Sequence, residues 1–391
     1  MTKEELVQLI DDVLGEKLKD VLQQQSDNQQ KWIEKILASQ RQQEQKAEKP
    51  NVGRLIRALA AGKGDPQKAA AFAQKAWKDE AIVKALQTDE GEAGGYLVPE
   101  EYSSQLIEYL RPLAVVRRMN PVIIPMETGT MSMPAVTGGA SAEYIGEGTN
   151  VPKSQPTFGQ VKLTWKKLAC LVPISNDLIR FSSPKADEVV RNDLVGAMAQ
   201  REDAAFIRDD GNNDKPKGLL NWIATANKFD ANETVNLANV TIDLAKAIYY
   251  LRKNETKFLN CGWILSPGSE LYLKTVRDSN GNFAFKGEMD QGRLFGFPFG
   301  VTTQVPDNLG DGEDESEIYF VDFADAAIGE SSRVEIEISS EAAYYDGSNV
   351  VSAFSLDQTV LRAIARHDFA MRRNTSGAVI QAVTWGSSIV S

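Results

Sequence analysis

The chain has 391 residues, enough for a sizeable hydrophobic core and for two or three structural units. Its formal net charge of -11 is unevenly placed: residues 1–90 balance fifteen Lys and Arg against fifteen Asp and Glu, so the remainder carries the whole acidic excess. This acidic excess argues against tight electrostatic binding of nucleic acid, because such binding requires Lys and Arg to neutralise the phosphates. Any contact with DNA is therefore expected to be weak and non-specific.

The two cysteines and the N-terminus indicate where the protein is kept. Cys170 and Cys261 lie far apart in apolar, strand-like runs, which predicts buried free thiols in a reducing compartment rather than a disulfide framework. The N-terminus lacks the apolar segment of a signal peptide, and no later segment has the eighteen or more apolar residues of a membrane span. The sequence thus predicts a cytosolic protein that makes no membrane contact.

A helical leader is predicted at the start of the chain. Apolar residues recur at three- and four-residue steps from Leu6 to Leu22 and again from Trp32 to Leu37, with a polar stretch between them. Pro50 ends this first helical stretch, and further helices are predicted from Val52 to Leu59 and from Ala69 to Leu86. No part of the leader provides a core of its own, so we expect it to self-associate or to dock on another surface.

An abrupt change of composition separates the leader from the body. The sequence Thr-Asp-Glu-Gly-Glu-Ala-Gly-Gly ends at Gly95, and a segment of different character begins at Tyr96. Acidic and glycine residues neither bury apolar area nor hold helical dihedrals cheaply, so this linker is predicted to be exposed and accessible to proteases. A cut is expected between about Lys84 and Glu92, and the predicted processing region consists of Lys84, Ala85, Leu86, Gln87 and Thr88.

An extended arm is predicted next. Pro121, Pro125 and Pro134 punctuate short strands that we expect to lie outside a compact core. From Phe158 to Pro173, apolar residues alternate with Lys and Thr, which predicts one strand of roughly 45 to 50 Å at about 3.3 Å per residue. Such a length favours a hairpin arm with one face on a neighbouring subunit.

A long helix follows the predicted arm. Ser182-Ser183-Pro184 supplies an N-cap and a first helical residue, and Gly211 supplies the stop. About 26 residues at 1.5 Å per residue give roughly 40 Å, which spans a domain. The stripe that this helix is predicted to bury consists of Val190, Leu194, Val195, Met198, Ala205 and Phe206.

Several short motifs follow one another in a specific order over nearly the whole chain. After the long helix, an acidic-glycine turn closes on Pro216-Lys217-Gly218-Leu219. Before it stand Gly95-Tyr96-Leu97-Val98-Pro99 and Gly146-Glu147-Gly148; after it come Trp263-Ile264-Leu265-Ser266-Pro267 and a closing segment from Arg362 to Phe369. Together with the helical leader, this order resembles the tailed-bacteriophage major capsid protein family, which has the Hong Kong 97 fold and an N-terminal scaffolding domain.

The resemblance implies an α+β shell subunit that assembles into pentamers and hexamers of an icosahedral head around double-stranded DNA. It further implies that the leader is an internal scaffold cut off by a maturation protease, that a portal protein is a partner, and that the virion is assembled in the cytoplasm of a host bacterium. The implied segments are a scaffolding leader (1–84), a cleavable linker (85–95), an N-arm (96–120), an E-loop hairpin (121–172), a peripheral domain (173–227 and 330–362) and an axial domain (228–329 and 363–391).

The resemblance also implies roles for residues near the tip of the E-loop. Glu147, Asn150 and Lys153 are expected to contact neighbouring subunits there. In some relatives, a Lys near this tip bonds covalently to an Asn of another subunit with the help of a Glu. By alignment, the Asn position falls at Ala353 and the Glu position at Val360, so no cross-link is expected. Lys153 is therefore interpreted as a surface or salt-bridging lysine.

An enzyme is the competing interpretation from another class. His367 is the only histidine and lies on an alternating strand, where a structural role is favoured over catalysis. One histidine and two distant cysteines cannot build a His/Cys zinc site. The acidic run from Asp311 to Glu317 lacks EF-hand spacing and is interpreted as a solvated loop, and the pair Glu143 and Glu147 lacks rigid support. No catalytic residue, metal or cofactor is therefore predicted.

Two alternatives to a phage head stay open at this point. An encapsulin-like cellular nanocompartment has the same fold, although the long leader and its linker favour the phage version. The alternative from another class is a coiled-coil-tethered hydrolase or carbohydrate-binding protein. A dispersed monomer with measurable turnover would favour this last interpretation.

Overall fold

A computed structural model describes residues 52–63, 65–88, 96–97, 100–138, 157–177, 184–331, 334–345 and 347–386. The chain divides into two compact units, Met1–Asn51 and Val52–Ser391. The first unit lies outside the described residues, and with it the long first helix of the leader. All that follows concerns the second unit.

Three helices open the second unit: α2 (Val52–Ala61), α3 (Pro66–Ala76) and α4 (Glu80–Thr88). The side chains of Asp65 and Asp79 begin α3 and α4 by accepting hydrogen bonds from backbone N–H groups of the first turn. The helix predicted from Val52 is confirmed, and the stretch predicted from Ala69 to Leu86 consists of two helices. The division at residue 84 stays a prediction about processing, whereas the compact unit begins at Val52.

The first sheet is organised around β15 (Gln358–Met371), its longest strand. β15 pairs antiparallel with β5, β11 and β12; β1 extends the sheet beyond β12, and β2 pairs parallel with β11. Residues 363–371, which the predicted boundaries assign to the second part of the axial domain, lie in this strand of the first sheet. The other five strands are β1 (Tyr96–Leu97), β2 (Val122–Pro125), β5 (Lys166–Ser175), β11 (Ala326–Glu330) and β12 (Glu335–Ser339).

The single long strand predicted from Phe158 to Pro173 is wrong. The structure has two strands there, β4 (Thr157–Thr164) and β5, with Trp165 at the break. β4 pairs with β3 (Thr130–Gly138) in a separate two-stranded hairpin, whereas β5 pairs with β15 in the first sheet. The chain therefore changes sheets at Trp165, which an alternating pattern of side chains cannot reveal.

The proline-rich segment enters the core, contrary to the expectation from the sequence. β2 belongs to the first sheet, and Met126 and Met133 are buried together with Leu163 of β4. Pro125 ends β2 and Pro134 lies on a strand of the two-stranded hairpin. Proline is compatible with both places, because neither a strand end nor an edge strand needs every backbone N–H for the ladder.

α8 (Pro184–Arg208) is the predicted long helix, and every residue of its predicted stripe that was named above is buried. Its N-terminal part packs with α2 and α5 (Glu100–Leu113), and its C-terminal part packs in a second cluster with Ile264 and Tyr319. A Cβ on Gly218 would lie within 2.7 Å of the backbone of this helix end, so only glycine fits where the chain returns. The helix thus joins two cores.

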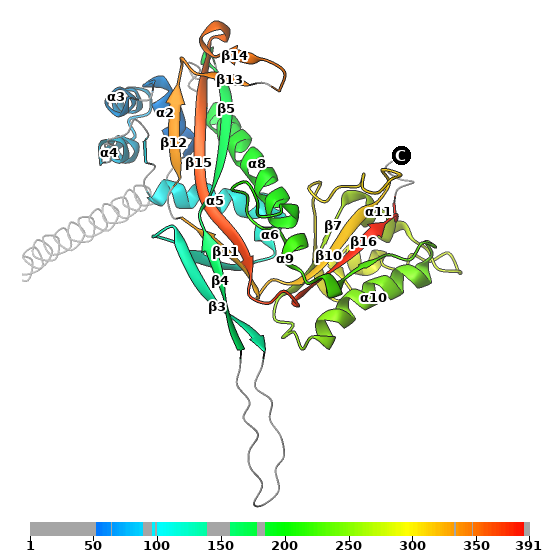
Figure 1. Ribbon diagram of the computed structural model, residues 1–391. Coiled ribbons are helices and arrows are strands. Elements are labelled where there is room, and N and C mark those ends of the chain that lie inside the picture. The colour runs from blue at the N-terminus through cyan, green and yellow to red at the C-terminus, as the bar shows by residue number, and fades with distance from the viewer. Residues whose placement is uncertain are drawn as a thin grey trace, which may run out of the picture. The chain divides into compact units, whose positions relative to one another are not determined.

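The second sheet has the order β6-β16-β10-β7-β9-β8, and α10 (Leu237–Lys253) covers one of its faces (Figure 1). Trp263 and Phe320 pack against each other in its core, with tilted rings whose centroids are 4.4 Å apart. Other elements here are α9 (Leu219–Trp222), η1 (Thr225–Asn227), α11 (Pro267–Thr275) and α12 (Lys286–Met289). Its strands are β6 (Lys228–Asp230), β7 (Cys261–Leu265), β8 (Arg293–Leu294), β9 (Phe297–Val301), β10 (Ser316–Asp322) and β16 (Gly377–Val383).

Two expectations from composition can be compared with the structure. Cys261 is buried and Cys170 is half-buried, and both are free thiols. Among the described residues, no helix combines the length and the apolar composition that a membrane span requires.

Candidate assembly surfaces and a buried polar junction

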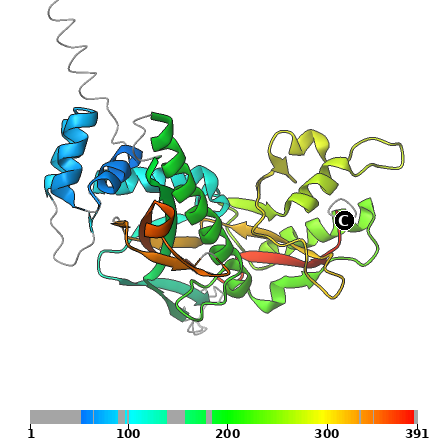
Figure 2. The same ribbon diagram turned by 90° about the horizontal axis from the view of Figure 1, so that it is seen from above.

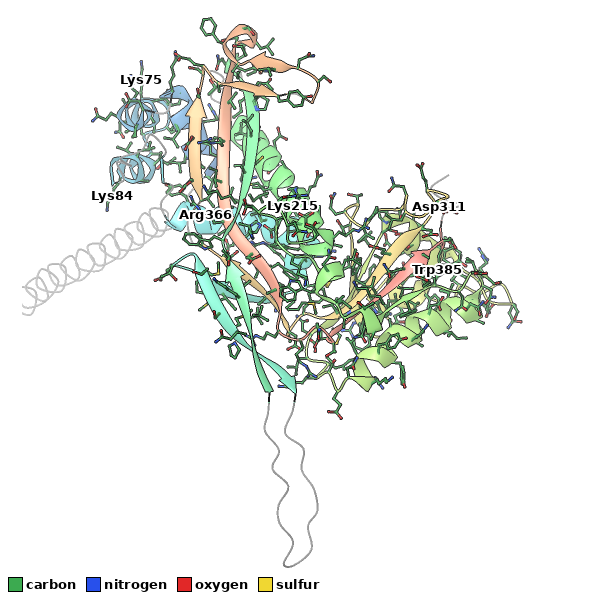
Figure 3. All side chains as sticks on the ribbon, viewed as in Figure 1. Lys75, Lys84, Lys215, Asp311, Arg366 and Trp385 are labelled. Atoms are coloured by element: carbon green, nitrogen blue, oxygen red, sulfur yellow. The ribbon has the colours of Figure 1, made fainter. Side chains whose placement is uncertain are left out.

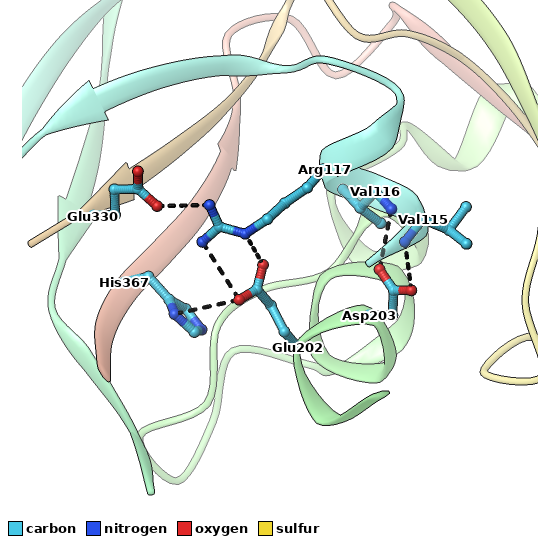
Figure 4. A network of polar contacts seen from close by, with 7 residues as sticks. All are labelled: Val115, Val116, Arg117, Glu202, Asp203, Glu330 and His367. Carbon is cyan, nitrogen blue, oxygen red and sulfur yellow. Dashed lines mark hydrogen bonds and ion pairs between the residues drawn. The ribbon is translucent and has the colours of Figure 1, made fainter. Parts of the chain in front are cut away.

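Ionisable side chains from four elements meet at a buried junction (Figure 4). Arg117 lies on α6 (Val115–Arg118), Glu202 on α8, Glu330 at the end of β11 and His367 on β15. The guanidinium of Arg117 donates to both oxygens of Glu202 and, through Nη1, to Oε2 of Glu330 at 2.7 Å. Arg117 therefore ties α6 to the long helix and to the first sheet.

The electrostatics of this junction keep one cation between two carboxylates. Burial lowers the pKa of Arg117, but the charges of Glu202 and Glu330 outweigh burial and raise the pKa above its ordinary value. Burial also lowers the pKa of His367, whose Nδ1 lies 3.8 Å from Oε2 of Glu202. His367 is thus neutral near pH 7 and packs edge-on against Phe206. This geometry supports the structural role that the sequence favoured for His367.

Asp203, which follows Glu202 on α8, caps the N-terminus of α6. Its two carboxylate oxygens accept hydrogen bonds from the backbone N–H groups of Val115 at 2.7 Å and Val116 at 3.0 Å. The N-cap position of α6 is Ala114, which has no side chain able to cap. Burial raises the pKa of Asp203 to about 6, although the two hydrogen bonds oppose this shift. Adjacent acids of α8 therefore hold both the start of α6 and its Arg117.

Sequence reasoning missed this junction, although a signal was present. Glu202 and Asp203 stand next to Ala205, Phe206 and Ile207, the most apolar part of the helix. Two carboxylates beside such a stripe must be paired when they are buried. Their hydrogen-bond partners are Arg117, Val116 and Val115, which lie 85 to 88 residues upstream, where local patterns do not connect them.

A second ion pair joins the long helix to the second sheet. Nε of Arg208, the last residue of α8, lies 3.2 Å from Oε2 of Glu317 on β10. Glu317 also accepts a hydrogen bond from the hydroxyl of Tyr319. The interpretation of Asp311 to Glu317 as a solvated loop is therefore wrong for Glu317, which is buried in a strand, whereas Asp311 is exposed. Among the described residues, no group of acids, histidines and cysteines is placed to hold a metal ion.

Among the described residues, large exposed apolar side chains gather in two places. The first, which we call the hairpin tip, comprises β13 (Ala343–Tyr345), β14 (Val350–Ser352) and η2 (Phe354–Leu356) at one end of β15 (Figure 1). Phe354 and Val350 there are 80% and 75% exposed. Clusters of this kind mark surfaces for other proteins, because solvent exposure of contiguous apolar area is unfavourable.

The second exposed cluster lies on the outer face of α10. Ile242 and Tyr249 are seven residues apart, which places them on the same side of the helix, and each is 57% exposed. The opposite side of α10 is buried in the core through Val240, Leu244 and Leu251. The helix is thus apolar on two faces, and the described chain covers only one of them.

The predicted site residues fall in different parts of the structure. Glu147, Asn150 and Lys153 lie outside the described residues, so their contacts stay a prediction. The processing region from Lys84 to Thr88 forms the end of α4, where Leu86 is buried and Lys84 points outward (Figure 3). A protease needs an extended backbone, so this helical stretch is a poorer substrate than the acidic linker that follows.

The positions implied for a cross-link are buried. Ala353 is completely buried and Val360 is 3% exposed. Their side chains are apolar and carry neither an amide nor a carboxylate. The expected absence of a cross-link stays a prediction, since Lys153 lies outside the described residues.

Comparisons with known proteins identify this chain as a shell protein. The Phage capsid family model matches residues 94–381. The chain belongs to the phage capsid family. It is 38% identical over 323 residues to the "Major capsid protein" of Klebsiella oxytoca phage phiKO2, covering 82% of this chain and 75% of that one. It is 25% identical over 207 residues to the "Major capsid protein" of Enterobacteria phage HK97, covering 52% of this chain and 51% of that one.

Solved structures are similar to this chain in fold. The capsid of an empty GTA particle has a TM-score of 0.54 at 17% identity, covering 69% of this chain and 90% of that one. A structure of Mycobacterium phage Cain has a TM-score of 0.51 at 17% identity, covering 77% of this chain and 97% of that one. The predicted α+β fold of a phage capsid protein is therefore confirmed.

Proposed function

We propose that this chain is the major capsid protein of a tailed bacteriophage, and that copies of it assemble into pentamers and hexamers of an icosahedral head. The observation that carries this proposal is the family match over residues 94–381 on a capsid-like fold. The two exposed apolar clusters support self-association, because a subunit that stayed a monomer would leave them in water. The role is structural, and the protein is a component of the virion.

The leader is proposed to act as an internal scaffold that a maturation protease removes. The cut falls between about Lys84 and Glu92, and the part after Thr88 meets the requirement for extended backbone best by composition. The family match begins at residue 94, at the end of this linker, which supports treating the leader as a separate part. Mass spectrometry of mature particles tests the cut, and a subunit that still begins at Met1 contradicts it.

The other proposed partners follow from the same role. A portal protein occupies one place in the head, and packaged double-stranded DNA is held by non-specific contact only, since the body is acidic. Assembly takes place in the cytoplasm of the host bacterium. No covalent ring forms between subunits, because Ala353 and Val360 replace the reactive and assisting residues. Covalent pentamers and hexamers that survive boiling in detergent would contradict this part.

The alternatives are separated by one experiment on the expressed protein. Negative-stain electron microscopy and size-exclusion chromatography are expected to show closed particles. A protein that stays monomeric at every salt and protein concentration overturns the proposal and favours the tethered hydrolase. An encapsulin-like compartment would also form particles, but the similarity to phage proteins supports the phage head over it.

A further inference from the structure

The helices α2, α3 and α4 are part of the core of the shell subunit. Leu55, Ile56 and Leu59 on α2 are essentially inaccessible to solvent, and they belong to the same apolar cluster as residues of α5, α8, β12 and β15. In Figures 1 and 2, α2 lies against the first sheet and the long helix, and α3 and α4 lie beyond it. The predicted boundary after residue 84 therefore does not coincide with a boundary in packing.

The three helices are also tightly built among themselves. Arg57 of α2 is buried, and its guanidinium lies 5.2 Å from the ring centroid of Trp77, which follows α3. Nη1 of Arg54 lies 3.4 Å from Oδ2 of Asp79, the residue that caps α4. A Cβ on Gly62 would lie 2.6 Å from the backbone N of Ala69, so glycine allows α3 to fold back closely on α2. This segment is an ordered small unit that docks through α2.

Cutting a peptide bond in the acidic linker removes none of these contacts. We propose that α2, α3 and α4 stay bound to the shell subunit after the chain is cut in the linker, so that cutting and release are separate events. The proposal rests on the proposed function only for the position of the cut. The compact unit that contains both these helices and the shell body begins at Val52.

Release would expose a specific apolar surface on the shell subunit. This surface is made by α5, the first part of α8, β12 and β15, and exposing it to water is unfavourable. The helices therefore leave only when another contact replaces them. The residues that they help to cover include Leu106, Leu110, Val190, Leu194, Ile336 and Leu361.

An engineered cut tests this inference directly. Residues 89–95 are replaced in the full chain by the recognition sequence of a site-specific protease, and the purified, unassembled subunit is cut to completion. We expect the leader fragment to elute with the body at equal stoichiometry in size-exclusion chromatography under native conditions, and to separate in denaturant. A fragment that separates after cutting without denaturant overturns the proposal. This outcome leaves the proposed shell function intact, because particle formation by the uncut chain is measured separately.

A matched pair of variants shows whether retention depends on the packed core. Ala73→Asp puts a charge at a completely buried position of α3, whereas Ala71→Asp makes the same change at an exposed position of the same helix. After cutting, the Ala73→Asp fragment is expected to be lost and the Ala71→Asp fragment to be retained. Hydrogen exchange of the fragment measures the same contrast, since a docked helix stays protected. Retention of both fragments with equal protection would overturn the argument that this packed core holds the helices to the body.

Discussion

The two six-stranded sheets of this subunit are built in different ways. The second sheet takes all its strands from residues 228–322 and 377–383, and apolar side chains cover its interior. The first sheet takes strands from as far apart as Tyr96 and Met371, and buried charges join it to α6 and α8. The second sheet is built mostly from one stretch of the chain, whereas the first is assembled from distant parts of it.

This difference shows what each kind of interaction contributes. Apolar burial is roughly proportional to area and does not depend on direction, so it stabilises a region without fixing how distant segments meet. A buried ion pair adds little net stability, yet it is costly to break. α6 and the long helix meet through the ion pair of Arg117 with Glu202 and through the backbone hydrogen bonds that Asp203 accepts, and these contacts hold them in one arrangement.

The strongest test of this contrast is to remove the central cation of the junction. Arg117→Met is expected to lower the free energy of unfolding by about 3 to 5 kcal/mol, because Glu202 and Glu330 would lose their shared partner. Denaturant titration of the unassembled subunit measures this. The control is Arg201→Met, which removes an arginine paired at the surface with Asp209 and should cost less than about 1 kcal/mol. Equal losses in the two variants would contradict the role of the junction.

The docking of the leader helices gives the next largest effect. Leu55→Ala on α2 is expected to lower the free energy of unfolding by about 2 to 5 kcal/mol, because it empties a fully buried position of the first core. Leu259→Ala makes the same change at a position that is 71% exposed in the second region, and it should alter stability by no more than about 0.5 kcal/mol. The prediction fails if Leu55 proves as tolerant as Leu259 in thermal and denaturant unfolding.

The pH dependence of the α6 cap has a definite sign. The pKa of Asp203 is raised from 3.8 to about 6, so the folded state disfavours its ionised form. Protonated Asp203 therefore adds to the stability of the folded state below about pH 4. This added stability, about 3 kcal/mol in total, is lost as the pH rises towards 6. Asp203→Asn does not titrate, so the stability of the wild type relative to this variant should fall between pH 4 and 6. A difference that rises or stays flat there contradicts the assignment.

The smallest expected change in stability comes with a large change in assembly. Phe354→Ser on the hairpin tip should leave the free energy of unfolding within about 0.5 kcal/mol of the wild type, because the ring is exposed in the subunit. If a neighbouring copy covers this ring, the concentration required for particle formation rises roughly tenfold, equivalent to about 1.4 kcal/mol. Light scattering measures the threshold. The control is Phe283→Ser in the second region, and an unchanged threshold for Phe354→Ser removes the hairpin tip from the assembly surfaces.

The features that the sequence predicted correctly are local ones. The buried stripe of α8, from Val190 to Phe206, follows from the helical repeat, and the start of the helix at Val52 follows Pro50 within two residues. The motif order from Gly95 to Phe369 led to the family. In each case the informative residues are neighbours in the chain or on one face of one helix.

The features that it missed depend on partners far away in the chain. Trp165 separates two strands because β3 and β15 lie in different sheets, and nothing near Trp165 encodes that difference. Glu317 continues an acidic run, yet it is buried because Arg208 is there to pair with it. Asp203 replaces a cap that the local sequence at Ala114 lacks.

The length of β15 has a mechanical consequence. At about 3.3 Å per residue, its 14 residues form a strand of roughly 45 Å. It begins beside the hairpin tip and includes His367 of the junction. β5 and β12 both hydrogen-bond to its first half, so that half resists bending. If a neighbouring subunit displaces the hairpin tip, β15 would therefore move as a whole, including the part beside the junction of Arg117. The strand thus connects the exposed hairpin tip directly with the buried junction.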